Sequence, residues 1–129
     1  MPELEDPIEI YRRSLADLPV PNEAHPPVIQ RVEVWPYPEL TRLWVRVEVS
    51  PFVAFPNLAL RVVGPDEVVA ATMFMVEIRD AYQSVTLHLR QPPRSGERYA
   101  LEMELTRDEI ELDTRRLEFD LVFRDPHEA

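Results

Sequence analysis

The spacing of apolar residues changes at Val28, and this change constrains the fold more than any other feature of the chain. Beyond it, apolar and polar residues alternate in short runs separated by turn-forming residues. A period of two places every second side chain on the same side of a β-strand. The runs are Val28–Val34, Leu43–Val49, Leu58–Val62, Val68–Ile78, Val85–Leu89, Tyr99–Leu105 and Leu117–Phe123. They predict an all-β fold, a seven-stranded antiparallel sandwich in which one layer covers the other.

The N-terminal segment has helical spacing instead. Residues 6–18 favour a short helix, because Asp6 and Pro7 suit its first positions and Pro19 ends it. One apolar stripe runs along this helix at spacings of three and four residues: Ile8, Tyr11, Leu15 and Leu18. The segment is therefore expected to be a helical arm.

Prolines separate this arm from the strands. Residues 19–27 contain four prolines, which favour an extended, semi-rigid connector. The expected layout is an arm and connector at residues 1–27, a sandwich at 28–125 and a short tail at 126–129.

The first two runs predict their own register. If residues 38–41 form a hairpin loop closed by Tyr37 opposite Arg42, then Trp35 lies opposite Trp44. The other pairs follow: Glu33 with Arg46, Arg31 with Glu48, Val34 with Val45 and Val32 with Val47. Aromatic and opposite-charge pairs then share one side and valines the other, and a slip of one residue would bury the charges.

The segment from Gly96 to Met103, Gly-Glu-Arg-Tyr-Ala-Leu-Glu-Met, resembles the start of strand F in immunoglobulin-like and fibronectin type III-like sandwiches. The resemblance implies an immunoglobulin-like fold in which the hydroxyl group of Tyr99 bonds to nearby backbone. The chain lacks the cysteine pair of true immunoglobulin domains and a tryptophan between those positions. Antibody-like recognition is therefore not implied.

Charge excludes two classes of partner. The chain has 14 basic and 24 acidic residues and a net charge of −10, so phosphate backbones and anionic membranes repel it. We expect no nucleic-acid or membrane partner. There is no signal-peptide pattern and no apolar run long enough to span a bilayer, so we expect a cytoplasmic protein, or else an excised domain of a secreted or surface protein.

Catalytic motifs are absent from the sequence. No serine has a nucleophile-elbow setting, two glycines are too few for a phosphate loop, and His88 is expected on the surface. There is no cysteine to form a disulfide or bind a metal. We therefore expect no enzyme activity and no cofactor.

Acidic residues concentrate between positions 108 and 120. Such a cluster can bind Ca²⁺, which takes six to eight oxygen ligands. The spacing does not match a calcium loop, and neighbouring arginines compensate the charge. A solvated acidic edge without a metal is the preferred interpretation.

Two groups of residues are candidate binding surfaces. Trp35, Tyr37 and Trp44 gather at one end of the first hairpin, where they either lie under the arm or connector, bind a protein, or stack on a sugar. In the long run from residue 68 to residue 78, alternation turns Val69, Met73 and Met75 outward. It turns the other set toward the core: Ala70, Thr72, Phe74, Val76 and Ile78. The arm is the candidate cover for the outward group, and a β-bulge that turns both halves inward is the alternative.

These features favour a non-enzymatic protein-interaction or assembly module. It would bind a protein partner or self-associate through the arm or the Met73 and Met75 surface. The alternative is a carbohydrate-binding module that uses Trp35, Tyr37 and Trp44.

Composition also predicts a thermophilic source. All fourteen basic residues are arginine, and there are fourteen prolines but two glycines. These features are common in proteins that work at high temperature. We expect a thermal unfolding midpoint above the range of about 45–65 °C that is usual for mesophilic domains. Calorimetry on the purified chain tests this, and a midpoint within that range would contradict it.

Overall fold

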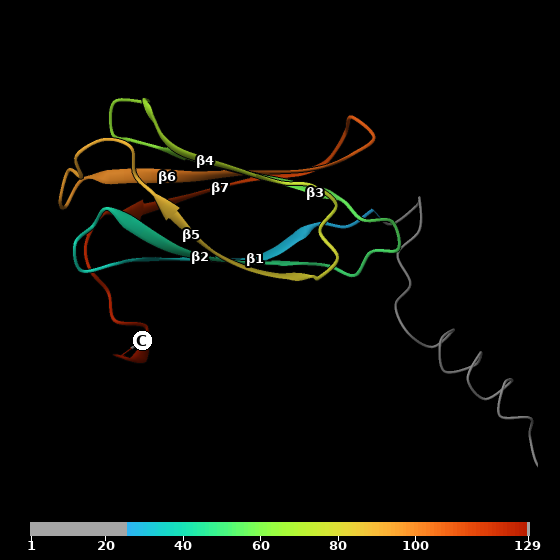
Figure 1. Cartoon of the computed structure of the whole chain (residues 1–129), viewed down its shortest axis with the longest axis horizontal. Coiled ribbons are helices and arrows are strands. Elements are labelled where there is room, and N and C mark those ends of the chain that lie inside the picture. Colours follow the sequence, from blue (N-terminus) through green and yellow to red (C-terminus); the bar gives the residue numbers. More distant parts are fainter. Residues whose placement is uncertain (1–25, 129) are drawn as a thin grey trace, which may run out of the picture.

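Seven β-strands form two antiparallel sheets in the structure, a computed structural model that describes residues 26–128 (Figure 1). The strands are β1 (Ile29–Pro36), β2 (Arg42–Val49), β3 (Asn57–Val63), β4 (Val69–Met75), β5 (Tyr82–His88), β6 (Arg98–Arg107) and β7 (Ile110–Asp120). One sheet has the order β1-β2-β5 and the other β4-β3-β6-β7. The tail contains a short 3₁₀ helix, Pro126–Glu128. The all-β class and the seven strands are confirmed, whereas the predicted arm lies outside the described residues.

A layer of leucine and valine side chains lies between the two sheets. The largest fully buried residues include Leu43, Leu58, Leu60, Leu87, Leu101, Leu105 and Leu121. They come from strands of both sheets and from the segment after β7, so neither sheet has a core of its own. Full burial of one such side chain contributes about 1.5–3 kcal/mol to the free energy of folding.

The first hairpin has the predicted register. The N–H of Tyr37 donates to the carbonyl of Arg42 at 3.0 Å, and Trp35 pairs with Trp44. The predicted pairs Glu33 with Arg46, Arg31 with Glu48, Val34 with Val45 and Val32 with Val47 are all present. Leu40 has a φ of 65°, in the left-handed region, where the loop reverses.

A β-bulge shifts the register at the start of β1. The pairing passes from Ile29 opposite Val49 to Arg31 opposite Glu48, so that Gln30 is an extra residue. Ile29 is consequently buried at 6% exposure and Val28 is 42% exposed. The first buried residue of the predicted run Val28–Val34 is therefore Ile29 and not Val28.

The predicted orientation of β4 was wrong. Met73 and Met75 are partly buried and pack against the core, whereas Thr72 and Phe74 are exposed. The cause is a bulge opposite Val62 and Val63, which leaves Ala70 and Ala71 both buried. Because this extra residue reverses the sides on which residues 72–75 lie, an outward Met73 and Met75 surface does not form. Ile78 is buried as predicted, and a bulge in this run was the stated alternative.

Tyr99 makes the contact that the resemblance implied. It is 4% exposed, and its hydroxyl oxygen accepts a hydrogen bond from the backbone N–H of Arg94 at 3.0 Å. Its ring stacks on Phe119, with 6.1 Å between ring centroids. The side chain therefore ties the loop before β6 to the edge strand β7.

Side chains of β7 cover the free edge of β1. The N–H of Ile29 donates to Oδ2 of Asp113 at 2.8 Å. Arg115 donates to the carbonyl of Gln30 at 3.1 Å. These bonds join the two sheets along the outer edge of β1, with which no strand among residues 26–128 pairs.

Removing the Tyr99 hydroxyl tests its structural role. We expect Tyr99→Phe to lower the free energy of unfolding by about 1–2 kcal/mol, because the partly buried N–H of Arg94 loses its acceptor. Urea unfolding measures the change. Tyr82→Phe, at an exposed position, is the matched control and should change the stability by less than about 0.5 kcal/mol. Equal effects of the two substitutions would contradict this role.

Candidate functional site

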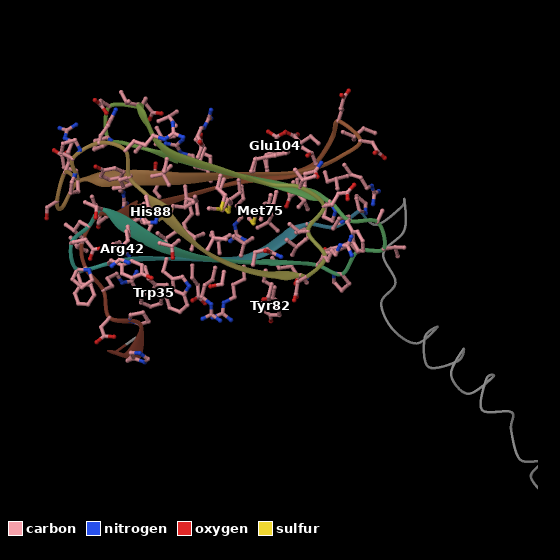
Figure 2. All side chains as sticks on the ribbon, in the orientation of Figure 1. Trp35, Arg42, Met75, Tyr82, His88 and Glu104 are labelled. Atoms are coloured by element: carbon pink, nitrogen blue, oxygen red, sulfur yellow. The ribbon has the colours of Figure 1, made fainter. Side chains whose placement is uncertain are left out.

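The three predicted aromatic residues lie on the outer side of the three-stranded sheet. Figure 2 shows Trp35, Arg42 and Tyr82 on the side of this sheet that faces away from the other. We call this surface the aromatic face and define it by Arg31, Glu33, Trp35, Tyr37, Arg42, Trp44, Arg46, Glu48, Tyr82 and Ser84. Strand pairing places them side by side, because Trp35 lies opposite Trp44, and Arg46 lies between Glu33 and Ser84.

An arginine covers each of the three rings. The guanidinium carbons of Arg42, Arg46 and Arg124 lie 4.2, 5.2 and 4.9 Å from the ring centroids of Tyr37, Trp44 and Trp35 respectively. Cation–π contacts of this kind contribute about 0.5–1 kcal/mol at exposed sites. The rings and guanidinium groups therefore form one mixed surface rather than a bare aromatic platform.

Both indole N–H groups have acceptors. Nε1 of Trp35 donates to Oε2 of Glu33 at 3.1 Å, and Nε1 of Trp44 donates to Oγ of Ser84 at 2.7 Å. Because each indole is held at its N–H and covered by a guanidinium group, both tryptophans have a fixed orientation.

Glu33 is the acidic residue most affected by its surroundings on this face. The hydrogen bond from Trp35 lowers its pKa below the usual value, and the charges of Arg31 and Arg46 act in the same direction. Partial burial opposes them. The carboxylate is therefore charged at neutral pH and stays so into mildly acidic solution.

The C-terminal tail completes one end of the aromatic face. Phe123, Arg124 and Pro126 line a hollow of about 200 Å³ together with residues of the hairpin: Trp35, Pro36, Tyr37, Pro38 and Trp44. Figure 1 shows the tail passing from β7 to the outer side of the three-stranded sheet. This contribution of the tail was not predicted from the sequence, in which the arm or the connector was the expected cover. The contact of Arg124 with Trp35 joins residues 89 positions apart, and no local pattern signals it.

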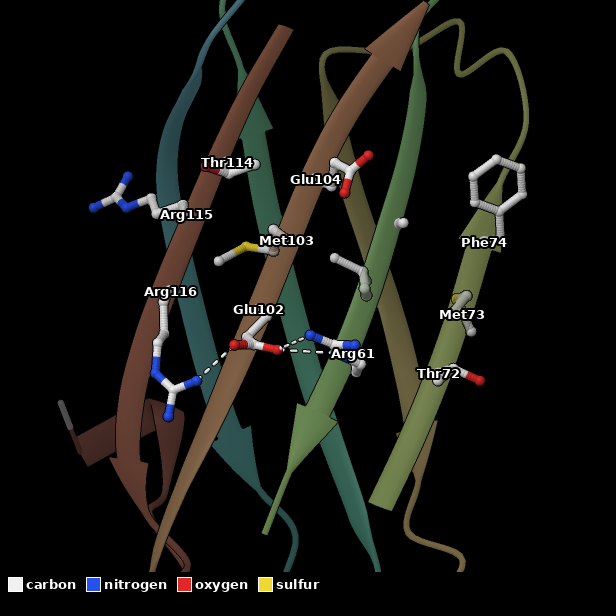
Figure 3. Close-up of a pocket in the computed structure, with 12 residues that line it drawn as sticks. Arg61, Thr72, Met73, Phe74, Glu102, Met103, Glu104, Thr114, Arg115 and Arg116 are labelled. Atoms are coloured by element: carbon white, nitrogen blue, oxygen red, sulfur yellow. Dashed lines mark hydrogen bonds and ion pairs between the residues drawn. The ribbon is translucent and has the colours of Figure 1, made fainter. Parts of the chain in front are cut away.

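A larger hollow, of about 650 Å³, lies on the outer side of the four-stranded sheet (Figure 3). At its floor Glu102 accepts hydrogen bonds from Arg61 at 2.9 Å and from Arg116 at 2.6 Å. These two arginines lower the pKa of Glu102, with Arg61 the larger cause. The three residues are direct cross-strand neighbours on β3, β6 and β7. They satisfy one another, which is typical of an ion-pair row that stabilises a sheet.

The acidic segment from residue 108 to residue 120 follows the same pattern. Asp113 accepts from the backbone of Ile29, and Asp120 pairs with Arg98 at 3.1 Å. Within residues 26–128, no three histidine or acidic side chains lie close enough together to hold a metal ion. His88 is exposed, as predicted, and lies opposite Arg42 in the pairing of β2 with β5.

The structure brings together one of the two predicted groups. Trp35, Tyr37 and Trp44 share the aromatic face, whereas Met73 and Met75 contribute to the core side of β4. The arm residues Ile8, Tyr11, Leu15 and Leu18 lie outside the described part of the chain. No helix in that described part is long and apolar enough to span a bilayer.

No protein-family model and no curated protein matches this chain. Solved structures do resemble it. A glycosyl hydrolase family 2 member from Bacteroides cellulosilyticus has a TM-score of 0.58 and 14% identity, over 75% of this chain and 15% of its own. The β-glucuronidase from Ruminococcus gnavus has a TM-score of 0.55 and 16% identity, over 74% of this chain and 16% of its own.

The β-D-glucuronidase of Dictyoglomus thermophilum matches in the same way, with a TM-score of 0.53 and 17% identity over 73% of this chain and 15% of its own. The chain thus spans about 15% of the length of the enzymes that it resembles. At these identities the likeness shows a common β-sandwich fold and does not show a common activity.

Acidification should report on the contact between Glu33 and Trp35. Because the folded pKa of Glu33 lies below 4.5, its stabilising contribution is complete above the unfolded pKa and is lost as the pH falls through the folded value. In a Trp44→Phe variant, Trp35 is the remaining tryptophan. We expect its fluorescence to change with a midpoint below pH 4.5.

Glu33→Gln in the same background is the control and should abolish this transition. Far-UV circular dichroism must stay constant over the range, so that unfolding is not the cause. A midpoint at or above pH 4.5 would contradict the proposed stabilisation of the charged carboxylate.

Proposed function

We propose that this chain is a non-enzymatic interaction module and that its aromatic face binds a protein partner. The observation that carries the proposal is the guanidinium group over each of the rings Trp35, Tyr37 and Trp44. Tryptophan, tyrosine and arginine are the residues enriched at the energetic centres of protein interfaces. Here they form a continuous surface on a rigid sheet, which requires little ordering when a partner binds.

The same geometry is less suitable for a stacked sugar. A sugar ring packs its C–H groups on an open aromatic surface, and here a guanidinium group lies over each ring, from Arg42, Arg46 and Arg124. The indole N–H groups are also used within the protein. A glycan would therefore have to displace contacts that are already made.

Carbohydrate binding is nevertheless the second candidate, because the solved structures that resemble this chain include a glycosyl hydrolase family 2 member and a β-glucuronidase. The resembling region makes up about 15% of those enzymes. A domain of this kind in a carbohydrate-active assembly would be an accessory domain, without the catalytic residues of the whole enzyme.

We further propose that the sandwich is of the immunoglobulin-like type. In constant-type immunoglobulin domains the first, second and fifth strands lie in one sheet and the third, sixth and seventh in the other. The same grouping occurs here, and β4 differs by pairing with β3. The hydrogen bond to the Tyr99 hydroxyl supports the same assignment.

Affinity capture followed by fluorescence titration tests the proposed function. Wild-type chain, Arg46→Ala chain and Arg116→Ala chain serve as three baits. The last is the matched control, because Arg116 is an exposed arginine on the opposite sheet. Trp35 and Trp44 are the chain's two tryptophans and both lie on the aromatic face, so intrinsic fluorescence reports binding there directly.

We expect Arg46→Ala to lower the affinity for the captured partner by about 30-fold, which corresponds to a loss of about 2 kcal/mol at an interface centre. Arg116→Ala should leave the affinity unchanged. A stacked glycan gives the opposite sign, since Arg46→Ala uncovers Trp44. Equal binding of a protein partner to all three chains would overturn the proposal.

A further inference from the structure

Four exposed apolar side chains cluster at the end of the sandwich where the described chain begins. Val28 and Phe55 are each 42% exposed, Val76 is 65% exposed and Val53 is 67% exposed. We call this group the apolar end. It lies on different segments from the aromatic face, and the inference below goes beyond the proposed function.

Hydrogen bonds hold the segments of the apolar end together. The N–H of Ser50, at the start of the loop that contains Val53 and Phe55, donates to the carbonyl of Val28 at 2.9 Å. The N–H of Ile78 donates to the carbonyl of Pro56 at 2.8 Å. The loop after β2 therefore joins the start of β1 to the loop after β4, and Figure 1 shows both loops at the end where the chain enters.

The apolar end rests on fixed neighbours. Phe55 packs edge to face on Phe52, with 6.4 Å between ring centroids, and Phe52 packs against the core. The guanidinium carbon of Arg79 lies 5.2 Å from the ring centroid of Phe55. Exposed apolar side chains that are supported in this way form a surface that another apolar group can cover without rearrangement.

The N-terminal segment is attached at this position. Pro27 is fully buried, so the chain is anchored directly beside Val28. Residues 1–25 lie outside the described residues, and an apolar stripe within them has helical spacing: Ile8, Tyr11, Leu15 and Leu18. A helix of thirteen residues is marginal in water unless its apolar side is covered. The stripe is therefore a candidate cover for the apolar end.

We propose that residues 6–18 form a helix that docks through this stripe on the apolar end of the same chain. Residues 19–25, if extended, span about 22 Å, which is long enough for the helix to turn back onto the apolar end. The tether gives an effective concentration in the millimolar range, so docking within one chain is favoured over docking on a second copy. This surface replaces the incorrectly predicted Met73 and Met75 surface as the docking site of the arm.

A double-mutant cycle on the full chain tests the docking. Leu15→Ala and Phe55→Ala each remove one side of the contact, and urea unfolding gives the equilibrium constant of each variant. If the two side chains act independently, the double variant changes the unfolding equilibrium constant by the product of the two single changes. We expect the measured change to be about tenfold smaller than that product. Val53→Asp serves as a second variant of the apolar end should Phe55→Ala fail to fold.

Val68→Ala is the matched control. Val68 is 41% exposed, close to the 42% of Phe55, and lies in the turn between β3 and β4. Combined with Leu15→Ala, it should change the unfolding equilibrium constant by the product of the two single changes. The proposal is overturned if Leu15→Ala and Phe55→Ala also act independently of each other.

The mass in solution separates the two modes of docking. Docking within one chain requires that the chain is a monomer when the coupling between Leu15→Ala and Phe55→Ala is measured. Light scattering across the concentration range of the unfolding experiment gives this mass. If the wild-type chain is a dimer and either substitution dissociates it, the arm docks on a second copy and the proposed intramolecular contact is wrong.

Discussion

The structure depends on the burial of one apolar side of each sheet against the other. Leucines such as Leu43 and Leu87 in the three-stranded sheet and Leu60 and Leu101 in the four-stranded sheet are fully buried in a single layer. Once this layer forms, the outer sides of both sheets have no remaining structural need for apolar residues. They carry instead the charged rows and the aromatic face on which the proposed function depends. The core therefore determines where a binding surface can be, although it does not determine what binds.

Regular alternation was sufficient to predict the strands and the register of the first hairpin. A slip of one residue there would bury Glu33 and Arg46, so few registers were possible. The two departures from this alternation occurred at bulges, at Gln30 and at Ala70. A bulge adds one residue to a strand without a characteristic composition, and the run around Ala70 is apolar on both sides. The last run was predicted to begin at Leu117, whereas β7 begins at Ile110. The turn before it is formed by Asp108 and Glu109, which both have positive φ, and no glycine marks it.

The candidate site was predictable to the extent that it is local. Trp35, Tyr37 and Trp44 belong to one hairpin, and the alternation that defines the strands also places them on one side. Two of the groups that contact them come from elsewhere: Ser84 from β5 and Arg124 from the tail. Contacts between distant segments depend on how the sheets are layered, and periodicity carries no information about them. The distinction between an open aromatic platform and an arginine-covered surface therefore required the structure.

The side chains that cover β1 have a consequence for how this domain behaves beside copies of itself. Asp113 and Arg115 bind backbone groups at the start of that strand, which would otherwise be free to pair with an incoming strand. An intermolecular sheet that grows from this position must first break a charged contact between two layers. The cover is thus a built-in barrier to fibril growth, and it is made of two side chains rather than an additional strand. A chain rich in β-branched residues can then be kept at high concentration without extending its sheet through this edge.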